Sequence, residues 1–185
     1  MAEPGLGRFI DRFTVEYVRT FPHPIERVWR AISDPGEFSA WFIPGTLELK
    51  ERGAYFFDSE GWTGVVMALE PPTFIRFSTG KGANGDYGER GFFQYHLEPV
   101  PGGTRMRFLQ HFPPEHDYPV RGDGSPGDGT PWPGSVSGWH EFWDALADHL
   151  NGKPRGSRRA RHARWQELNR IYDDHMRATL PAKAT

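Results

Sequence analysis

The eight histidines of this chain could supply metal ligands or proton-transfer groups, and their spacing decides between these uses. A zinc site of the H-E-x-x-H kind needs two histidines four residues apart on one helix. His140 has Asp144 at that position instead, and His149 lies nine residues away, off the same helical face. His111 and His116 leave a metal site open, but a tetrahedral site needs three or four converging ligands. We therefore expect no metal and no cofactor.

Two glycine-rich stretches match the G-x-G-x-x-G pattern that cradles dinucleotide phosphates: residues 80–85 and 122–127. That fingerprint requires a strand before it and a helix directly after it. The first stretch lies between two expected strands, and the second contains Pro126, so we interpret both as loops. The chain has no cysteine and no G-x-S-x-G motif, which excludes disulfides, thiolate chemistry and the serine nucleophile elbow.

Polar side chains on otherwise apolar strand faces indicate a function more clearly than the histidines or glycines do. They are Tyr55, Tyr95 and Gln110, on three predicted strands, and Arg19 on the apolar face of a fourth strand. Buried polar groups need partners, and small-molecule pockets combine apolar walls with a few converging polar groups. The alternative is that these residues are simply core, with Arg19 extending to solvent and the tyrosines bonded to backbone. The candidate ligand-binding set is Arg19, Trp41, Tyr55, Phe57, Met67, Phe77, Phe93, Tyr95, Phe108, Gln110, Trp139, Phe142 and Trp143.

The elements that position these residues follow from hydrophobic periodicity. Alternation over residues 12–21 predicts a half-buried strand. Helical spacing after Pro24 predicts a short helix, and Asp34 is placed to cap a second one that stops at Pro44. Short turn sequences then separate six further strands, which favours hairpins in an antiparallel sheet. These strands are expected at 46–51, 54–59, 63–70, 73–79, 91–100 and 104–112.

The chain after the last strand contains a long polar loop and two helices. Residues 113–136 are too long for a plain connector, so we expect either a lid, with Trp132 at the cavity mouth, or a surface loop. An apolar stripe predicts a long helix over 137–151, and a basic linker over 155–164 leads into a weaker amphipathic helix. The expected fold class is α+β: a seven-stranded curved antiparallel sheet wrapped around the long helix, which encloses a cavity.

Composition favours one folded domain, residues 1–151, followed by a basic linker and helix packed on it, residues 152–185. Aromatic residues make up 15% of the chain, and the net charge is only −2. We interpret the basic run at 155–164 as a solvated linker or a segment lying on the acidic body, with a phosphate or anionic-lipid patch as the alternative. The acidic body argues against a nucleic acid partner. No apolar run approaches the roughly 18 residues of a membrane span, and we expect a cytoplasmic location.

Several motifs follow one another in a specific order within residues 12–151: 24–35 with 41–42, 53–57, 64–66 with 70–72, 103–106 running to 111, and 138–139 with Leu146 and Leu150. In this order the chain resembles the START-like, birch-pollen-allergen (SRPBCC) superfamily, and within it the branch named after the activator of the heat-shock-protein-90 ATPase. The resemblance implies a helix-grip domain with an internal cavity for apolar small molecules. Members include lipid carriers, plant hormone receptors, polyketide cyclases and the heat-shock co-chaperone.

Three functions are consistent with this resemblance. The preferred hypothesis is a non-catalytic protein that binds a small apolar or aromatic molecule, because no catalytic set is assembled in the sequence. The first alternative is a polyketide cyclase/dehydratase-like enzyme that uses Tyr, His or Arg in a desolvated cavity. The second is a chaperone ATPase activator-like interaction protein. The family-like strand begins near residue 12, so we expect no counterpart of the co-chaperone's separate N-terminal domain. A homodimer is left open.

Overall fold

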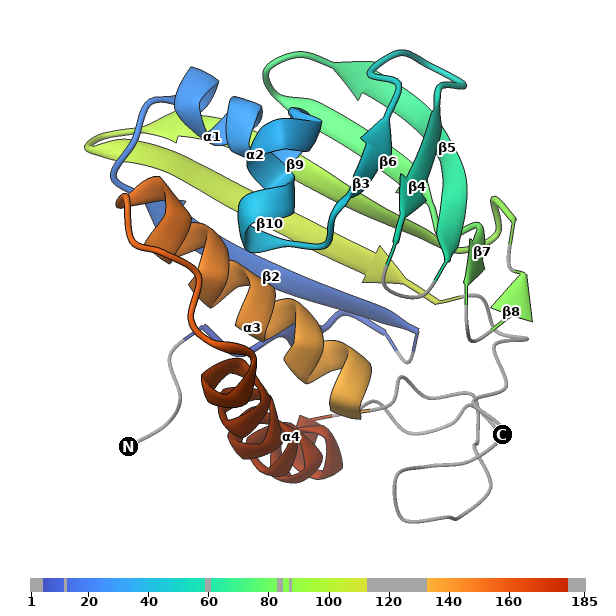
Figure 1. Ribbon diagram of the computed structural model, residues 1–185. Helices are drawn as coiled ribbons and strands as arrows, with labels where there is room; N and C mark the ends of the chain where they lie inside the picture. The colour runs from blue at the N-terminus through green and yellow to red at the C-terminus, as the bar shows by residue number, and fades with distance from the viewer. Residues whose placement is uncertain are drawn as a thin grey trace.

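A computed structural model of the chain describes residues 5–11, 13–58, 61–82, 85–86, 88–112 and 133–179. Its main feature is one curved antiparallel sheet that wraps around helix α3 (Figure 1). The strand order is β1-β2-β10-β9-β6-β5-β4-β3, with the short strands β7 and β8 attached to β5. The strands are β1 Arg8–Phe9, β2 Thr14–Phe21, β3 Gly45–Leu47, β4 Ala54–Phe57, β5 Trp62–Glu70, β6 Phe74–Ser78, β7 Lys81–Gly82, β8 Gly85–Asp86, β9 Phe92–Val100 and β10 Gly103–His111.

Within the described residues, four helices accompany the sheet: α1 Ile25–Ser33, α2 Pro35–Trp41, α3 Pro133–Leu150 and α4 Arg158–Thr179. The side chain of Asp34 caps α2, since its Oδ1 accepts hydrogen bonds from the N–H groups of Gly36 at 2.8 Å and Glu37 at 3.3 Å. Helices α1 and α2 lie at one end of α3, on the same side of the sheet (Figure 1). The predicted α+β fold is confirmed, and the described part of the chain has three more strands than the seven expected.

The core lies between the concave face of the sheet and α3. Alternate residues of the central strands point into it, as period two requires: Val15 and Tyr17 on β2, and Met106 and Phe108 on β10, are all fully buried. Helix α3 contributes a stripe of apolar residues at helical spacing: Val136, Trp139, Trp143, Leu146 and Leu150. The core is therefore rich in aromatic rings, which pack in tilted, edge-on and stacked pairs.

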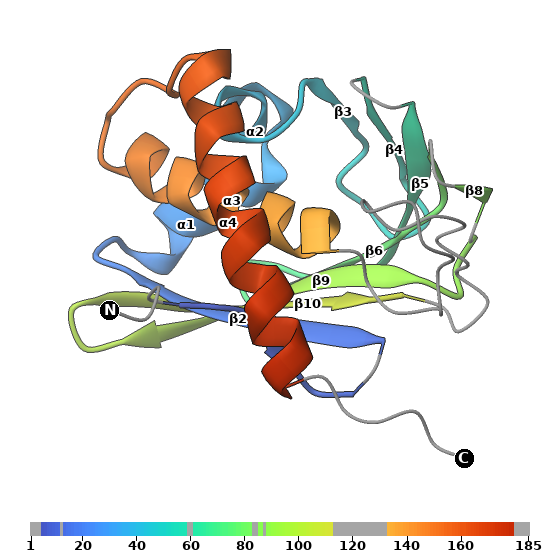
Figure 2. The same cartoon turned by 90° about the horizontal axis from the view of Figure 1, so that it is seen from below.

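Helix α4 packs across α3 and reaches the first strands of the sheet (Figure 2). The hydroxyl of Tyr172 accepts a hydrogen bond of 2.8 Å from the buried N–H of Gly7. The expected linker over 155–164 is wrong from residue 158 onward, because α4 already begins there. Ser157 precedes the first turn and its Oγ accepts from the N–H of Ala160, and arginine and alanine are good helix formers. No helix in the described ranges is long and apolar enough to cross a bilayer.

Two strand predictions need correction. The strand expected at 46–51 ends at Leu47, because a turn follows in which Arg52 has a positive φ of 61° and the Gly53 N–H bonds the Lys50 carbonyl. In β5 the register shifts between Val66 and Ala68, so Val66 rather than Met67 enters the core. The lid hypothesis for the loop 113–136 concerns mainly residues 113–132, including Trp132, which lie outside the described residues.

Candidate ligand-binding site

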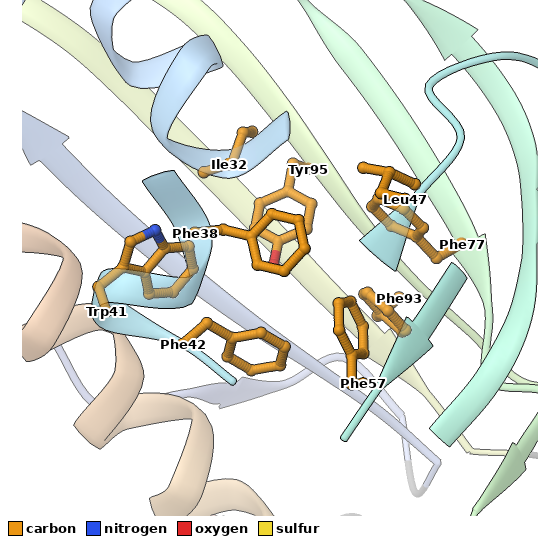
Figure 3. A pocket seen from close by; sticks show the side chains of 9 residues that line it. All are labelled: Ile32, Phe38, Trp41, Phe42, Leu47, Phe57, Phe77, Phe93 and Tyr95. Atoms are coloured by element: carbon orange, nitrogen blue, oxygen red, sulfur yellow. The ribbon is translucent and has the colours of Figure 1, made fainter. Parts of the chain in front are cut away.

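A small cavity of about 10 Å³ lies between the sheet, α1 and α2. The predicted location, between the sheet and the long helix, is wrong, because aromatic side chains of α3 fill that space and none of them lines the cavity. The walls of the cavity are apolar or aromatic apart from one hydroxyl, and they are formed by side chains of β3, β4, β6, β9, α1 and α2 together with Phe42. Figure 3 shows these side chains converging. A cavity of this size has room for roughly one water molecule. The lining residues are Ile32, Phe38, Trp41, Phe42, Leu47, Phe57, Phe77, Phe93 and Tyr95.

The floor of the cavity is built from cross-strand pairs. Phe77 of β6 and Phe93 of β9 are directly opposite in the register, and their rings stack with centroids 5.0 Å apart. Tyr95 lies two residues along β9 on the same face and meets Phe108 of β10 edge-on at 5.0 Å. Because successive residues of a strand alternate between faces, this row of rings follows directly from the alternation in the sequence.

Phe42, the residue that follows α2, makes the central ring contacts in the wall of the cavity opposite the β6–β9 floor. Its ring stacks on Trp139 at a centroid distance of 5.5 Å and meets Phe142 at 4.4 Å, so it joins α2 to α3. It also meets Phe57 of β4 edge-on at 5.1 Å. Phe42 is therefore one of the lining side chains that separate the cavity from α3.

Two polar groups in this apolar interior lack hydrogen-bond partners among the described residues. The Tyr95 hydroxyl belongs to the cavity lining and makes no hydrogen bond there. The indole N–H of Trp143 is buried without a partner, and its ring meets that of Tyr95 at 5.8 Å. Tyr55 differs, because its hydroxyl donates to the carbonyl of Ser78 at 2.7 Å. Burial raises the pKa of Tyr95 and of Tyr55 far above the ordinary tyrosine value.

Helix α2 is fastened over the cavity by charged groups on its outer side. Glu37 pairs with Arg27 at 2.7 Å and with Arg30 at 2.8 Å, and its Oε2 lies 2.9 Å from Nε2 of His149 in the last turn of α3. Burial alone would raise the pKa of Glu37, but hydrogen bonds from His149 and Arg27 lower it below the usual value. At the other end of α2, Arg155 donates to the carbonyl of Phe42.

The structure brings most of the predicted site residues together. Those that line the cavity are Trp41, Phe57, Phe77, Phe93 and Tyr95. Those packed behind the lining are Tyr55, Phe108, Trp139, Phe142 and Trp143. Gln110 is buried on the same sheet face, opposite Phe93 in the register, but does not line the cavity.

Arg19 and Met67 lie away from the cavity. Arg19 is on the concave face of β2, opposite Met106, but its guanidinium turns to the N-terminal segment and donates to the Gly5 carbonyl at 2.5 Å. Met67 is displaced by the shift of register in β5 and is outside the hydrophobic core. The predicted strand face of Arg19 is therefore confirmed, although its long side chain leads the guanidinium away from the cavity, whereas the predicted face of Met67 is wrong because of the bulge.

Sequence reasoning missed four lining residues: Ile32, Phe38, Phe42 and Leu47. A signal existed for three of them. Ile32 belongs to the apolar stripe of α1, and two aromatic residues flank Trp41 within the second predicted helix. Leu47 gave no signal, because an edge strand of three residues is too short to show a periodicity.

The architecture, a curved sheet around one long helix with an enclosed apolar pocket, defines the class of protein: an SRPBCC-type helix-grip domain. Within that class, residues 22–151 match the family model described as "Activator of Hsp90 ATPase homolog 1-like protein", and the chain belongs to this family. A comparison with curated proteins finds no match.

Solved structures support the fold. The solution structure of CalU16 from Micromonospora echinospora has a TM-score of 0.65 and 17% identity, and the match covers 97% of this chain and 100% of that one. A protein of unknown function, EF2215 from Enterococcus faecalis, has a TM-score of 0.67 and 14% identity over 96% and 93% of the two chains. DynU16, a protein in the dynemicin biosynthetic locus, has a TM-score of 0.59 and 22% identity, and the match covers 78% of this chain and 49% of that one.

Proposed function

We propose that this protein binds a small apolar or aromatic molecule in the cavity between α1, α2 and the sheet. The observation that supports this most directly is an apolar cavity whose one lining hydroxyl, on Tyr95, has no hydrogen-bond partner in the described part of the chain. This hydroxyl opens onto the cavity, so a ligand with a single polar group could form a hydrogen bond with it while its apolar part packs against the walls. The fold supports the proposal, because it is one that holds small molecules between sheet and helix.

Binding requires the cavity to expand, since about 10 Å³ is far less than a ligand occupies. Helix α2 is the segment that we expect to move. It has only seven residues, and it covers the cavity with Phe38, Trp41 and the following Phe42. Polar contacts at its two ends hold it in place, whereas the rings on its inner side make non-directional contacts that can be exchanged for those of a ligand.

Two alternatives remain as second candidates. DynU16 belongs to a biosynthetic locus, which favours a cyclase- or dehydratase-like enzyme on this fold. The titratable group in the described lining is Tyr95, and no second acid–base side chain lines the cavity there to exchange a proton with it, which favours binding over turnover. The family name favours a chaperone-directed role, for which stimulation of a chaperone ATPase is the direct assay.

The cytoplasmic location stays a prediction, to be checked by cell fractionation.

The test uses a neutral fluorescent probe, N-phenyl-1-naphthylamine, titrated against the wild-type protein and two variants. Leu47→Trp adds a large side chain to the cavity wall and is expected to reduce probe affinity at least about tenfold. Leu49→Trp is the matched control, because Leu49 is two residues away and 43% exposed; it should change the affinity less than about twofold.

Two results would contradict the proposal: wild-type protein that does not bind the probe, or binding that Leu47→Trp leaves unchanged. Native and denaturing mass spectra of the purified protein provide an independent measurement. A mass excess that disappears on denaturation would identify a captured ligand.

A further inference from the structure

Arg155 crosses back over α3 and reaches the outer side of the cavity wall. It follows the end of α3, yet it donates a hydrogen bond to the carbonyl of Phe42, and its guanidinium lies 5.7 Å from the ring centroid of Phe142. These two rings are in contact at 4.4 Å, and Phe42 lines the cavity. The guanidinium is therefore separated from the cavity by a pair of aromatic side chains.

A second guanidinium, that of Arg161 in the first turns of α4, lies nearby. The side chain of Arg161 passes close to Gly156, the residue that follows Arg155: a Cβ atom at Gly156 would lie 3.9 Å from Cγ of Arg161. Burial lowers the pKa of Arg155, and the positive charge of Arg161 lowers it further. The two like charges are thus held close together in a partly desolvated position.

Both arginines have hydrogen-bonding capacity that the protein does not use. Their Nε atoms are buried, and neither has a hydrogen-bond partner within the described ranges. Glu141 of α3 is close enough to both arginines to interact with them electrostatically. Among the described residues, however, no ion pair joins Glu141 to either arginine. Burial raises the pKa of Glu141 in spite of the two positive charges. One partly buried carboxyl therefore faces two guanidiniums, which leaves an excess of positive charge.

We propose that the ligand of this protein is amphipathic: its apolar body occupies the cavity, and an anionic group, such as a carboxylate, binds Arg155 and Arg161. This inference rests on the proposed function and specifies the chemistry of its ligand. Displacement of the Phe42 ring, which binding requires in any case, brings the cavity and the two guanidiniums into one site. Arginine suits this role, because its planar fork of N–H donors matches the geometry of a carboxylate.

The experiment compares two probes with the same apolar body. 8-Anilinonaphthalene-1-sulfonate carries one anionic group, whereas N-phenyl-1-naphthylamine lacks it. We expect the wild type to bind the sulfonate more tightly than the neutral probe, and salt to weaken only the sulfonate. Arg155→Gln and Arg161→Gln should each lower the ratio of the sulfonate affinity to the neutral-probe affinity about fivefold to tenfold, and Arg161→Gln, which breaks no contact with α2, should change the affinity for the neutral probe less than about twofold.

Controls separate a local effect from a general one. Arg158→Gln removes a charge from the same basic run at an exposed position, and it should leave both affinities unchanged. Arg155→Lys keeps the charge and should retain part of the preference for the sulfonate, which also covers the case in which the glutamine variant unfolds. Equal affinity for both probes in the wild type, or a sulfonate affinity that the Arg155 and Arg161 variants do not change, would overturn the inference. Failure of both probes to bind would overturn the proposed function and this inference with it.

Discussion

Helix α3 has two contrasting interfaces. Toward the sheet it presents Trp139 and Trp143 to other aromatic rings, and the buried N–H of Trp143 has no partner there. Toward α4 it presents hydrogen-bonding groups: Nδ1 of His140 lies 3.0 Å from the Tyr172 hydroxyl, and Asp144 pairs with Arg164 at 3.2 Å. One side of the helix is held by shape and the other by directed polar contacts.

The contrast indicates that the two sides of α3 have different roles. Contacts between apolar rings are non-directional and can be exchanged for contacts with a ligand. Hydrogen bonds in a desolvated interface specify one geometry, because each unpaired group is unfavourable. The α3–α4 side therefore acts as a rigid frame, and the side facing the cavity can adapt. Two buried tyrosines, Tyr172 and Tyr95, lie on opposite sides of α3 and allow this difference to be tested with one type of substitution.

The largest effect is expected for Tyr172→Phe, on the frame side. The change removes the acceptor of the buried Gly7 N–H and the contact with His140. We expect the free energy of unfolding to fall by about 1–3 kcal/mol, as is typical when a buried donor loses its partner. Urea unfolding followed by circular dichroism measures it. A change below about 0.5 kcal/mol would contradict the frame interpretation.

A smaller effect is expected for Glu37→Gln, which weakens the fastening of α2. Hydrogen bonds lower the pKa of Glu37 in the folded protein, so the folded state binds this proton more weakly than the unfolded chain. The carboxylate therefore stabilises the fold above a pH of about 4.5, and the contribution is lost as the pH falls through the lowered pKa. The variant should be less stable by under about 1 kcal/mol at neutral pH.

The pH dependence identifies the cause of the Glu37 effect. The stability difference between wild type and variant should shrink as the pH falls below about 4.5 and through the lowered pKa of Glu37. Urea unfolding at several pH values measures this difference, and titrating groups that do not contact Glu37 cancel because both proteins share them. A difference that stays constant with pH would show that Glu37 acts through packing and not through its charge.

The smallest effect is expected for Tyr95→Phe, the counterpart of Tyr172→Phe on the cavity side. Its hydroxyl has no partner among the described residues, so removal leaves no hydrogen bond broken. The free energy of unfolding should change by less than about 0.5 kcal/mol, since replacing an unpaired buried polar group by an apolar one is close to neutral. The same urea experiment applies. A loss of more than about 1 kcal/mol would mean that the hydroxyl is hydrogen-bonded in the empty protein.

Much of the site could be predicted from the sequence, because it depends on local periodicity. Alternation along β9 placed Phe93 and Tyr95 on one face, and the helical stripe of α3 placed Trp139 beside Trp143. The prediction failed where a local pattern was interrupted. The bulge in β5 exchanged Met67 for Val66, and this could not be foreseen because one inserted residue reverses every later side chain.

The residue types and the faces of strands and helices were therefore determined by the sequence, since backbone geometry alone sets periods of 2 and 3.6 residues. So was the exclusion of thiol chemistry, because there is no cysteine. Only the tertiary structure decided the size of the cavity, the isolation of the Tyr95 hydroxyl and the return of Arg155 to the carbonyl of Phe42, 113 residues earlier in the chain. Those features depend on how distant elements approach one another, and packing of whole side chains, not local pattern, sets that distance.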